Sequence, residues 1–169
     1  MHQTKAYSPS PLSVPFGANL SQEISAWLAH SSQLLDDENF LEWLALTTAC
    51  FSYTITTYSP EIESDVVFLE KDRKGLVRLF DQLSMHERYP DTFRRILSVS
   101  RITDVTPQSC DVVTPLSVFH TDLGGATGLY CVGVYTDRFE LNTASGPILA
   151  MRKVKLDTRR LPFGSHIPI

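Results

Sequence analysis

Residues 111–141 of this 169-residue chain, DVVTPLSVFHTDLGGATGLYCVGVYTDRFEL, determine its fold class. Two segments rich in β-branched and aromatic residues, 111–123 and 127–141, flank Gly124-Gly125-Ala126, which predicts two long strands. Glycine adopts the positive φ values that tight hairpin turns require, so we expect the tripeptide to join these strands. Because the glycines precede a strand and open no helix, they do not fit a phosphate-binding loop.

The first half of the chain has a different pattern. Apolar residues recur at helical spacing in three segments, which begin after Asn19 or Ser21, at Phe40 and at Arg73. Residues 51–58 are rich in aromatic and β-branched side chains and predict a strand between the second and third helices.

Two further strands are predicted at residues 93–106 and 147–158, whereas residues 60–71 show no clear pattern. Helices followed by a run of strands are typical of an α+β domain. We therefore expect a long, curved, largely antiparallel sheet whose one face is covered by N-terminal helices, in the shape of a cone.

Length and composition favour one domain over residues 20–169, preceded by an extended arm over residues 1–19. The arm contains Pro9, Pro11 and Pro15, which disfavour helix. The net charge of −4 argues against nucleic-acid binding. Three widely spaced cysteines favour a reducing cytoplasm, and neither a signal peptide nor a membrane span is expected.

The sequence predicts no metal or cofactor site. Non-haem iron needs two histidines and a carboxylate that converge, but no two of the five histidines lie four residues apart or form an H-E-x-x-H motif. A Rieske cluster needs two cysteines and two histidines at close spacing, and no histidine lies near Cys50, Cys110 or Cys131. We therefore expect no catalytic, cofactor-binding or metal-binding residue in this chain.

One alternative depends on His120 and Asp122, which lie two apart on a predicted strand and thus point to the same face. If that face lined the cone, they would form an acid–base pair with help from Tyr53, Tyr130 and Tyr135, as in a stand-alone isomerase or dehydratase. Side chains near a hairpin tip are usually solvated, and we prefer that interpretation. A binding or scaffold protein without an enzyme partner is a third hypothesis.

Six segments carry a resemblance to a known family. They are AHSSQLLDDE (29–38), FLEWLAL (40–46), FSYTITTYSP (51–60), RYPDTFRRILSVS (88–100), GVYTDRF (133–139) and RKVKLDTRRL (152–161). In this order they resemble the β (small) subunits of Rieske-type aromatic-ring-hydroxylating dioxygenases and related multicomponent monooxygenases. Residues 58–62 and 68–73 look more like a branch that includes the small subunits of alkanesulfonate monooxygenases.

This resemblance implies a cystatin-like fold of the nuclear transport factor two-like superfamily. It also implies an α₃β₃ hetero-hexamer, whose catalytic α subunits carry a Rieske [2Fe-2S] cluster and a mononuclear iron and take electrons from NADH through a separate reductase. This chain would be a non-catalytic β subunit that trimerises and supports assembly and stability of the α subunits. The complex would hydroxylate an aromatic compound, as in aromatic hydrocarbon catabolism, or a small organic acid or sulfonate.

Candidate subunit contacts follow from charge and polarity. Arg159 and Arg160 are predicted to pair with carboxylates of a neighbouring subunit, because guanidinium groups suit interfacial ion pairs. Arg94 and Arg95 either belong to a solvated face, which is the simpler interpretation, or pair with a neighbouring subunit in the same way. The apolar segment 161–169, with Phe163 and His166, is predicted to lie against a neighbour or, alternatively, against its own domain.

Overall fold

The computed structural model describes residues 18–83, 92–141, 146–162 and 168–169. The elements follow in chain order as α1 (Ala18–Asp36), α2 (Phe40–Ala45), β1 (Thr47–Ser59), β2 (Ser64–Asp72), α3 (Arg73–Leu83), β3 (Thr92–Leu97), β4 (Arg101–Thr103), β5 (Ser109–Thr121), β6 (Thr127–Glu140) and β7 (Ile148–Leu156). The strands form one sheet in the order β2-β1-β7-β6-β5-β3, and β4 also pairs with β5.

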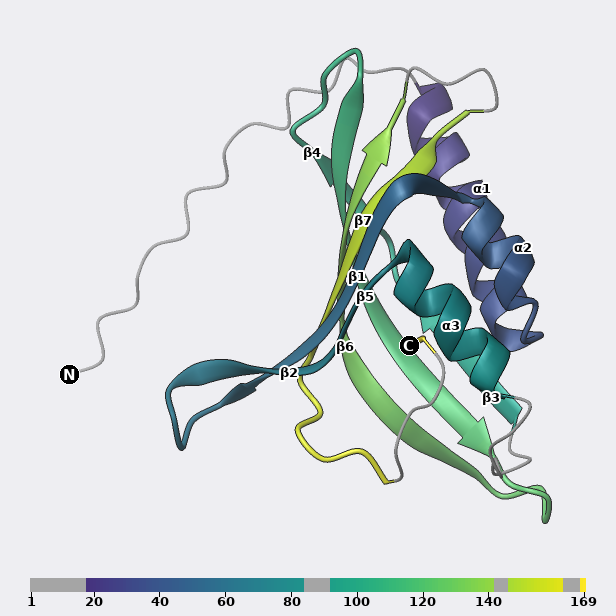
Figure 1. Ribbon diagram of the computed structural model, residues 1–169, viewed down its shortest axis with the longest axis vertical. Coiled ribbons are helices and arrows are strands. Elements are labelled where there is room, and N and C mark those ends of the chain that lie inside the picture. The colour runs from purple at the N-terminus through teal and green to yellow at the C-terminus, as the bar shows by residue number, and fades with distance from the viewer. Residues whose placement is uncertain (1–17, 84–91, 142–145, 163–167) are drawn as a thin grey trace.

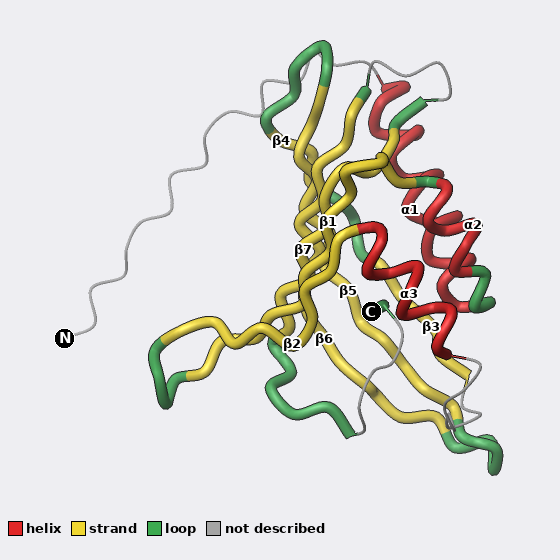
Figure 2. Tube along the Cα trace, viewed as in Figure 1, coloured by secondary structure: helices red, strands yellow, loops and turns green. Residues whose placement is uncertain are grey.

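The sheet curves around the three helices, which all lie on one of its faces (Figure 1). Helix α1 lies beside β3, and α3 packs against β1 and β2. The tube in Figure 2 shows the same two layers, with the helices on one side of the strands. This arrangement confirms the predicted α+β cone. Helix α1 already begins at Ala18, within the range expected for the arm, and residues 1–17 lie outside the described part.

The predicted hairpin around the glycines is confirmed. Strands β5 and β6 pair from Ser109–Glu140 to Thr121–Thr127. Between them Gly125 has a φ of 84°, a left-handed conformation that glycine adopts without steric cost. This hairpin provides two of the three longest strands of the sheet, β5 and β6.

The prediction of one strand over residues 93–106 was wrong, because this stretch forms two strands. Strand β3 pairs with β5 up to Leu97–Leu116, and β4 resumes at Arg101–Val113. The break faces Pro115, which has no N–H to donate to the ladder. Instead, the Pro115 carbonyl accepts a hydrogen bond of 2.9 Å from Ser98 N–H.

Residues 60–71, which showed no clear pattern, contain most of β2. This strand lies at the edge of the sheet, and most of its side chains on both faces are exposed, so its burial does not alternate. Strand β1 pairs with β2 antiparallel but with β7 parallel, for example at Ile55–Val154. The parallel pair makes the sheet mixed.

The core lies between the helices and the sheet and centres on Trp43, which is fully buried. Its ring meets the rings of Phe51 and Tyr53 edge-to-face at 5.7 and 6.0 Å. Its indole N–H donates a hydrogen bond of 3.0 Å to Ser31 Oγ on α1, which satisfies its one polar atom. The core therefore extends from α1 through α2 to β1.

Candidate functional site

A buried ion pair joins β6 and β7 on the face that the helices cover. Asp137 and Arg152 lie opposite each other in the register, and their side chains are 0% and 1% exposed. Arg152 donates from Nε and Nη2 to the two carboxylate oxygens of Asp137 at 2.8 and 2.7 Å. Such a bidentate arrangement is the strongest geometry for this pair.

Arg152 is further enclosed by aromatic rings. Its guanidinium carbon lies 4.0 Å from the ring centre of Tyr135 and 5.8 Å from that of Trp27. Burial by itself disfavours the charged guanidinium, but the Asp137 carboxylate outweighs that effect and raises the pKa of Arg152 above its ordinary value. The interior of the cone therefore holds a permanent, compensated charge.

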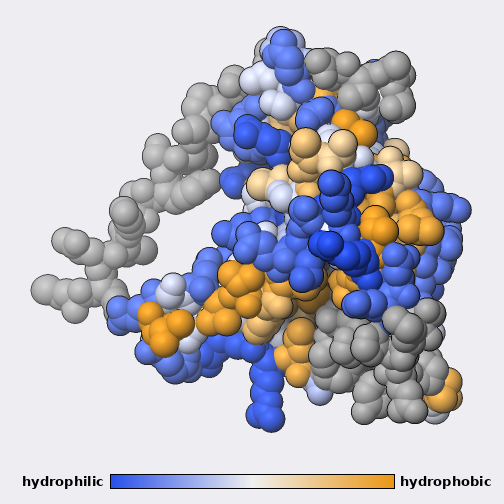
Figure 3. Space-filling view, in the orientation of Figure 1, coloured by the Kyte–Doolittle hydropathy of each residue, from blue (hydrophilic) through white to orange (hydrophobic). Residues whose placement is uncertain are grey.

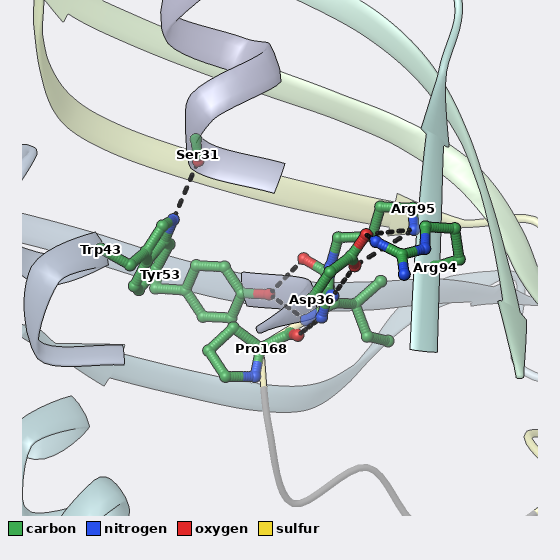
Figure 4. Close-up of polar contacts among 8 residues, drawn as sticks. Ser31, Asp36, Trp43, Tyr53, Arg94, Arg95 and Pro168 are labelled. Carbon is green, nitrogen blue, oxygen red and sulfur yellow. Dashed lines mark hydrogen bonds and ion pairs between the residues drawn. The ribbon is translucent and has the colours of Figure 1, made fainter. Parts of the chain in front are cut away.

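A second polar group lies in the interior, where Tyr53, Arg95 and Pro168 come together (Figure 4), and Ile169 bonds to Tyr53 there. The Tyr53 hydroxyl accepts a hydrogen bond of 2.9 Å from Ile169 N–H and donates one of 3.1 Å to the Ile169 carbonyl. Arg95 Nη2 donates to the Pro168 carbonyl, and Arg95 Nη1 donates to Asp36 Oδ1 at 2.6 Å. The segment thus binds to β1 and β3 of its own chain.

Burial raises the pKa values of the Tyr53 and Tyr135 hydroxyls above their ordinary range. Both hydroxyls are therefore neutral at physiological pH. Within the part of the chain that the structure describes, Tyr135 Oη and Arg95 Nε are buried without a hydrogen-bond partner. Buried side chains of this chain lie in the interior together with Pro168 and Ile169.

A groove of about 620 Å³ lies between α1 and the edge formed by β3 and β4, and it shares Asp36 and Arg95 with the polar group around Pro168. Its lining is mixed, with Ser21, Ser25 and Gln33 beside Ile24 and Leu28 on the helix side, and Ser98 and Ser100 beside Leu97 and Val99 on the strand side. Neither His120 nor Asp122 lines it.

The structure does not support His120 and Asp122 as an acid–base pair. Asp122 is exposed, and its Oδ1 accepts a hydrogen bond of 2.9 Å from Ala126 N–H, so this carboxylate closes the hairpin turn. His120 packs over Gly128 and meets the Tyr130 ring edge-to-face at 6.4 Å. Of the other tyrosines expected to assist this pair, Tyr53 bonds to Ile169 and Tyr135 packs against Arg152.

Among the described residues, no group of three or more His, Cys, Asp or Glu side chains could hold a metal ion. Cys110 and Cys131 are buried in strands, and burial raises the pKa of their thiols to about 11 and about 12. Thiols of that kind are poor metal ligands because the thiolate is the ligand form. The described histidines and cysteines therefore do not fit an iron or iron–sulfur centre. None of the described helices is both long and apolar enough to cross a membrane.

Two curated proteins are similar to this chain over most of its length. It is 38% identical over 146 residues to the 2-aminobenzenesulfonate 2,3-dioxygenase subunit beta of an Alcaligenes species, a match that covers 86% of this chain and 97% of that protein. The methanesulfonate monooxygenase hydroxylase subunit beta of Methylosulfonomonas methylovora is 33% identical, with 80% of each chain covered. A search of protein-family models found no match.

The chain belongs to the β subunits of ring-hydroxylating dioxygenases and sulfonate monooxygenases. The predicted family is thereby confirmed, and so is membership of a dioxygenase or monooxygenase complex. A β subunit implies an α-subunit partner.

Solved structures share the fold of this chain. The β subunit of a putative aromatic-ring-hydroxylating dioxygenase from Novosphingobium aromaticivorans has a TM-score of 0.78 at 22% identity and covers 88% of this chain and 96% of its own. Naphthalene 1,2-dioxygenase with bound indole has a TM-score of 0.75 at 12% identity, and the match covers 92% of this chain and 88% of that chain. An NTF2-like protein with a cystatin-like fold from Novosphingobium aromaticivorans has a TM-score of 0.66 at 18% identity, and the match covers 84% of each chain. At these identities the likeness shows the fold alone, which confirms the predicted cystatin-like fold.

In this β subunit the predicted contact residues have different environments. Arg95 is buried and pairs within its own chain, whereas Arg94 is exposed and lies 3.5 Å from Asp36. Arg159 is exposed and pairs with Glu61 at 2.9 Å, and Arg160 is also exposed.

The two predicted contacts in the last segment, Phe163 and His166, lie outside the described residues. Pro168 and Ile169 lie against their own domain, which is the second alternative considered for this segment.

The β subunit also carries large apolar side chains on the outside of the β1–β2 hairpin. Tyr58, Ile62, Val67 and Phe68 are between 43% and 64% exposed. Figure 1 shows that this hairpin projects away from the body of the molecule, and Figure 3 shows apolar patches along it. Because β2 is an edge strand, its outer backbone groups are also open to a partner.

Sequence reasoning missed the buried polar residues, although a signal was present. In residues 127–141 the expected alternation places Asp137 in phase with Tyr135 and Phe139, which are buried. In residues 147–158 it places Arg152 in phase with Val154. A charge in the buried phase of each of two paired strands indicates an interior ion pair.

Proposed function

We propose that this chain is the non-catalytic β subunit of an α₃β₃ Rieske oxygenase, in which it trimerises and supports assembly and stability of the catalytic α subunits. The Rieske cluster and the mononuclear iron then belong to the α subunit, with electrons from NADH through a reductase and a cytoplasmic location. The observation that carries the proposal is the filled interior, where Arg152, Asp137 and Ile169 occupy the space between helices and sheet. A substrate would have to displace them.

The curated relatives also suggest the substrate class. Both are named for sulfonates, one aromatic and one aliphatic. We therefore propose that the complex oxidises an organic sulfonate rather than an unsubstituted aromatic hydrocarbon. The sulfonate would be bound by the α subunit.

Expression of this chain with and without its α partner tests the role. The chain alone should contain no stoichiometric iron by elemental analysis and should turn over nothing. The co-expressed proteins should elute as one complex with equal amounts of both chains, measured by size-exclusion chromatography with light scattering. Stoichiometric iron in the isolated chain would overturn the proposal.

Oxygen uptake by the reconstituted complex tests the substrate class. With NADH and a reductase, uptake should rise with 2-aminobenzenesulfonate or methanesulfonate and should stay at the background rate with naphthalene. Uptake with naphthalene but neither sulfonate would contradict the sulfonate assignment and leave the assembling role intact.

A further inference from the structure

Pro168 and Ile169 are held in the manner of a bound ligand. One hydroxyl, from Tyr53, satisfies both the N–H and the carbonyl of Ile169, at 2.9 and 3.1 Å. Arg95 donates to the preceding carbonyl, that of Pro168. The side chain of Ile169 is buried, and the whole residue is 2% exposed. Polar contacts thus come from two strands that are not neighbours in the sheet, β1 and β3.

The groups that hold the segment are fixed by other parts of the chain. Arg95 is oriented by Asp36, which accepts hydrogen bonds from Arg95 Nη1 at 2.6 Å and from Arg95 N–H at 3.2 Å. The ring of Tyr53 packs edge-to-face on Trp43. Because none of these contacts involves residues 168–169, the arrangement is expected to persist without them, as a preorganised site does.

The same region contains hydrogen-bonding atoms that Pro168 and Ile169 do not engage. Tyr135 Oη and Arg95 Nε have no hydrogen-bond partner in the described part of the chain, and the two residues are 0% and 5% exposed. Buried polar atoms are nearly always hydrogen-bonded, so each exception needs an explanation. These two atoms are explained if the region is a binding site for a polar molecule.

We propose that the interior of this cone is a binding site for a short peptide-like ligand and that Pro168–Ile169 is its resident occupant. The ligand class follows from the contacts. Tyr53 requires an N–H donor beside a carbonyl acceptor, and Arg95 requires a second carbonyl. The buried position of Ile169 requires a branched aliphatic side chain. This site is independent of the role in assembly.

Binding in trans tests the proposal. The chain has two tryptophans, so Trp27→Phe leaves Trp43 as the sole reporter, 6.0 Å from the Tyr53 ring. In that background, a variant lacking residues 168–169 is titrated with N-acetyl-prolyl-isoleucine. We expect a saturable change in Trp43 fluorescence and a higher melting temperature with the dipeptide. The chain that retains residues 168–169 should not respond, because its site is occupied.

Two controls distinguish specific binding at this site from nonspecific binding. N-acetyl-prolyl-asparagine, which has a polar side chain of similar size, should not bind. Tyr53→Phe in the shortened chain should weaken binding of N-acetyl-prolyl-isoleucine about tenfold, since it removes the group that makes two hydrogen bonds. No other hydrogen bond of the Tyr53 hydroxyl is present among the described residues.

The proposal is overturned if the shortened chain is folded by circular dichroism but does not respond to the dipeptide. An equal response of the chain that keeps residues 168–169 would overturn it as well. If the shortened chain does not fold, Ile169→Gly replaces it, because it keeps the backbone contacts and loses the apolar side chain. The dipeptide should then displace the weakened occupant, and its failure to do so counts against the site.

Discussion

The interior of the cone and the β1–β2 hairpin each depart from the usual distribution of polarity. The interior buries two charged pairs, Asp137–Arg152 and Asp36–Arg95, while the hairpin exposes Ile62 and Val67 to solvent. Charges in the interior are satisfied by other groups of the same chain. The apolar side chains of the hairpin, in contrast, are exposed to solvent. The comparison teaches that the interior is occupied by groups of the chain itself, whereas the hairpin leaves its apolar groups open to other chains.

The largest effect is expected from breaking the interior pair. Asp137→Ala leaves the Arg152 charge buried without its partner, so the free energy of unfolding should fall by about 3–5 kcal/mol. Urea denaturation of the isolated chain measures this loss.

A matched double substitution sharpens the interpretation. Asp137→Leu with Arg152→Met removes both charges and keeps apolar volume, so it should cost less than Asp137→Ala alone. A loss as large as that of the single variant would mean that shape, and not the uncompensated charge, dominates.

An intermediate effect is expected from the hairpin. Val67→Asp places a charge on the exposed edge strand, so it should change the free energy of unfolding by less than about 0.5 kcal/mol. It should nevertheless weaken self-association of the isolated chain about tenfold, measured by sedimentation equilibrium, because apolar edge strands pair with other copies. Val99→Asp, at a position that is 90% exposed away from the hairpin, is the control and should leave self-association unchanged.

The reactivity of the three thiols compares exposed and buried parts of the unaltered chain. Cys50 is exposed, whereas burial raises the pKa of Cys110 to about 11 and that of Cys131 to about 12. At pH 8, iodoacetamide should therefore modify one of the three thiols in the native chain and all three in urea, as counted by mass spectrometry. Rapid modification of Cys131 in the native chain would mean that the interior opens.

The smallest effect concerns Glu61 at the hairpin tip. Hydrogen bonds from the Ser59 hydroxyl and from Arg159 lower the pKa of Glu61 from 4.5 to about 2. A lowered folded-state pKa means that this contact stabilises the native state above about pH 4.5, and that the contribution disappears as the pH falls towards 2. An NMR titration should show the low pKa, and Ser59→Ala should raise it. An unshifted value in the unaltered chain would exclude the contact in solution.

The sequence predicted the elements whose period is clear. The glycine hairpin and the helical spacing around Trp43 follow from local chemistry, so the α+β cone could be predicted. Strand β2 could not, because an edge strand exposed on both faces has no alternation of polarity. The break at Ser98 could not be placed either, since it depends on Pro115 in another strand.

The interior was predicted least well. Arg94 and Arg95 are adjacent and chemically equal, yet one is exposed and the other is buried. Strand alternation places Arg95 on the same face as Phe93 and Leu97, and Arg94 on the opposite face. The partners of Arg95, Asp36 and Pro168, lie 59 and 73 residues away in the sequence, and local patterns do not identify them.

The parallel pairing of β1 with β7 has a consequence for synthesis of the chain. Strand β1 ends at Ser59, but its central neighbour in the sheet does not begin until Ile148. During translation the first helices and the β1–β2 hairpin therefore leave the ribosome long before the sheet can be joined through the middle. Until then the edge of β1 that pairs with β7 has unpaired backbone groups, which are open to aggregation or to chaperones. Closure of the whole sheet thus waits until β7, the last strand in chain order, has been made.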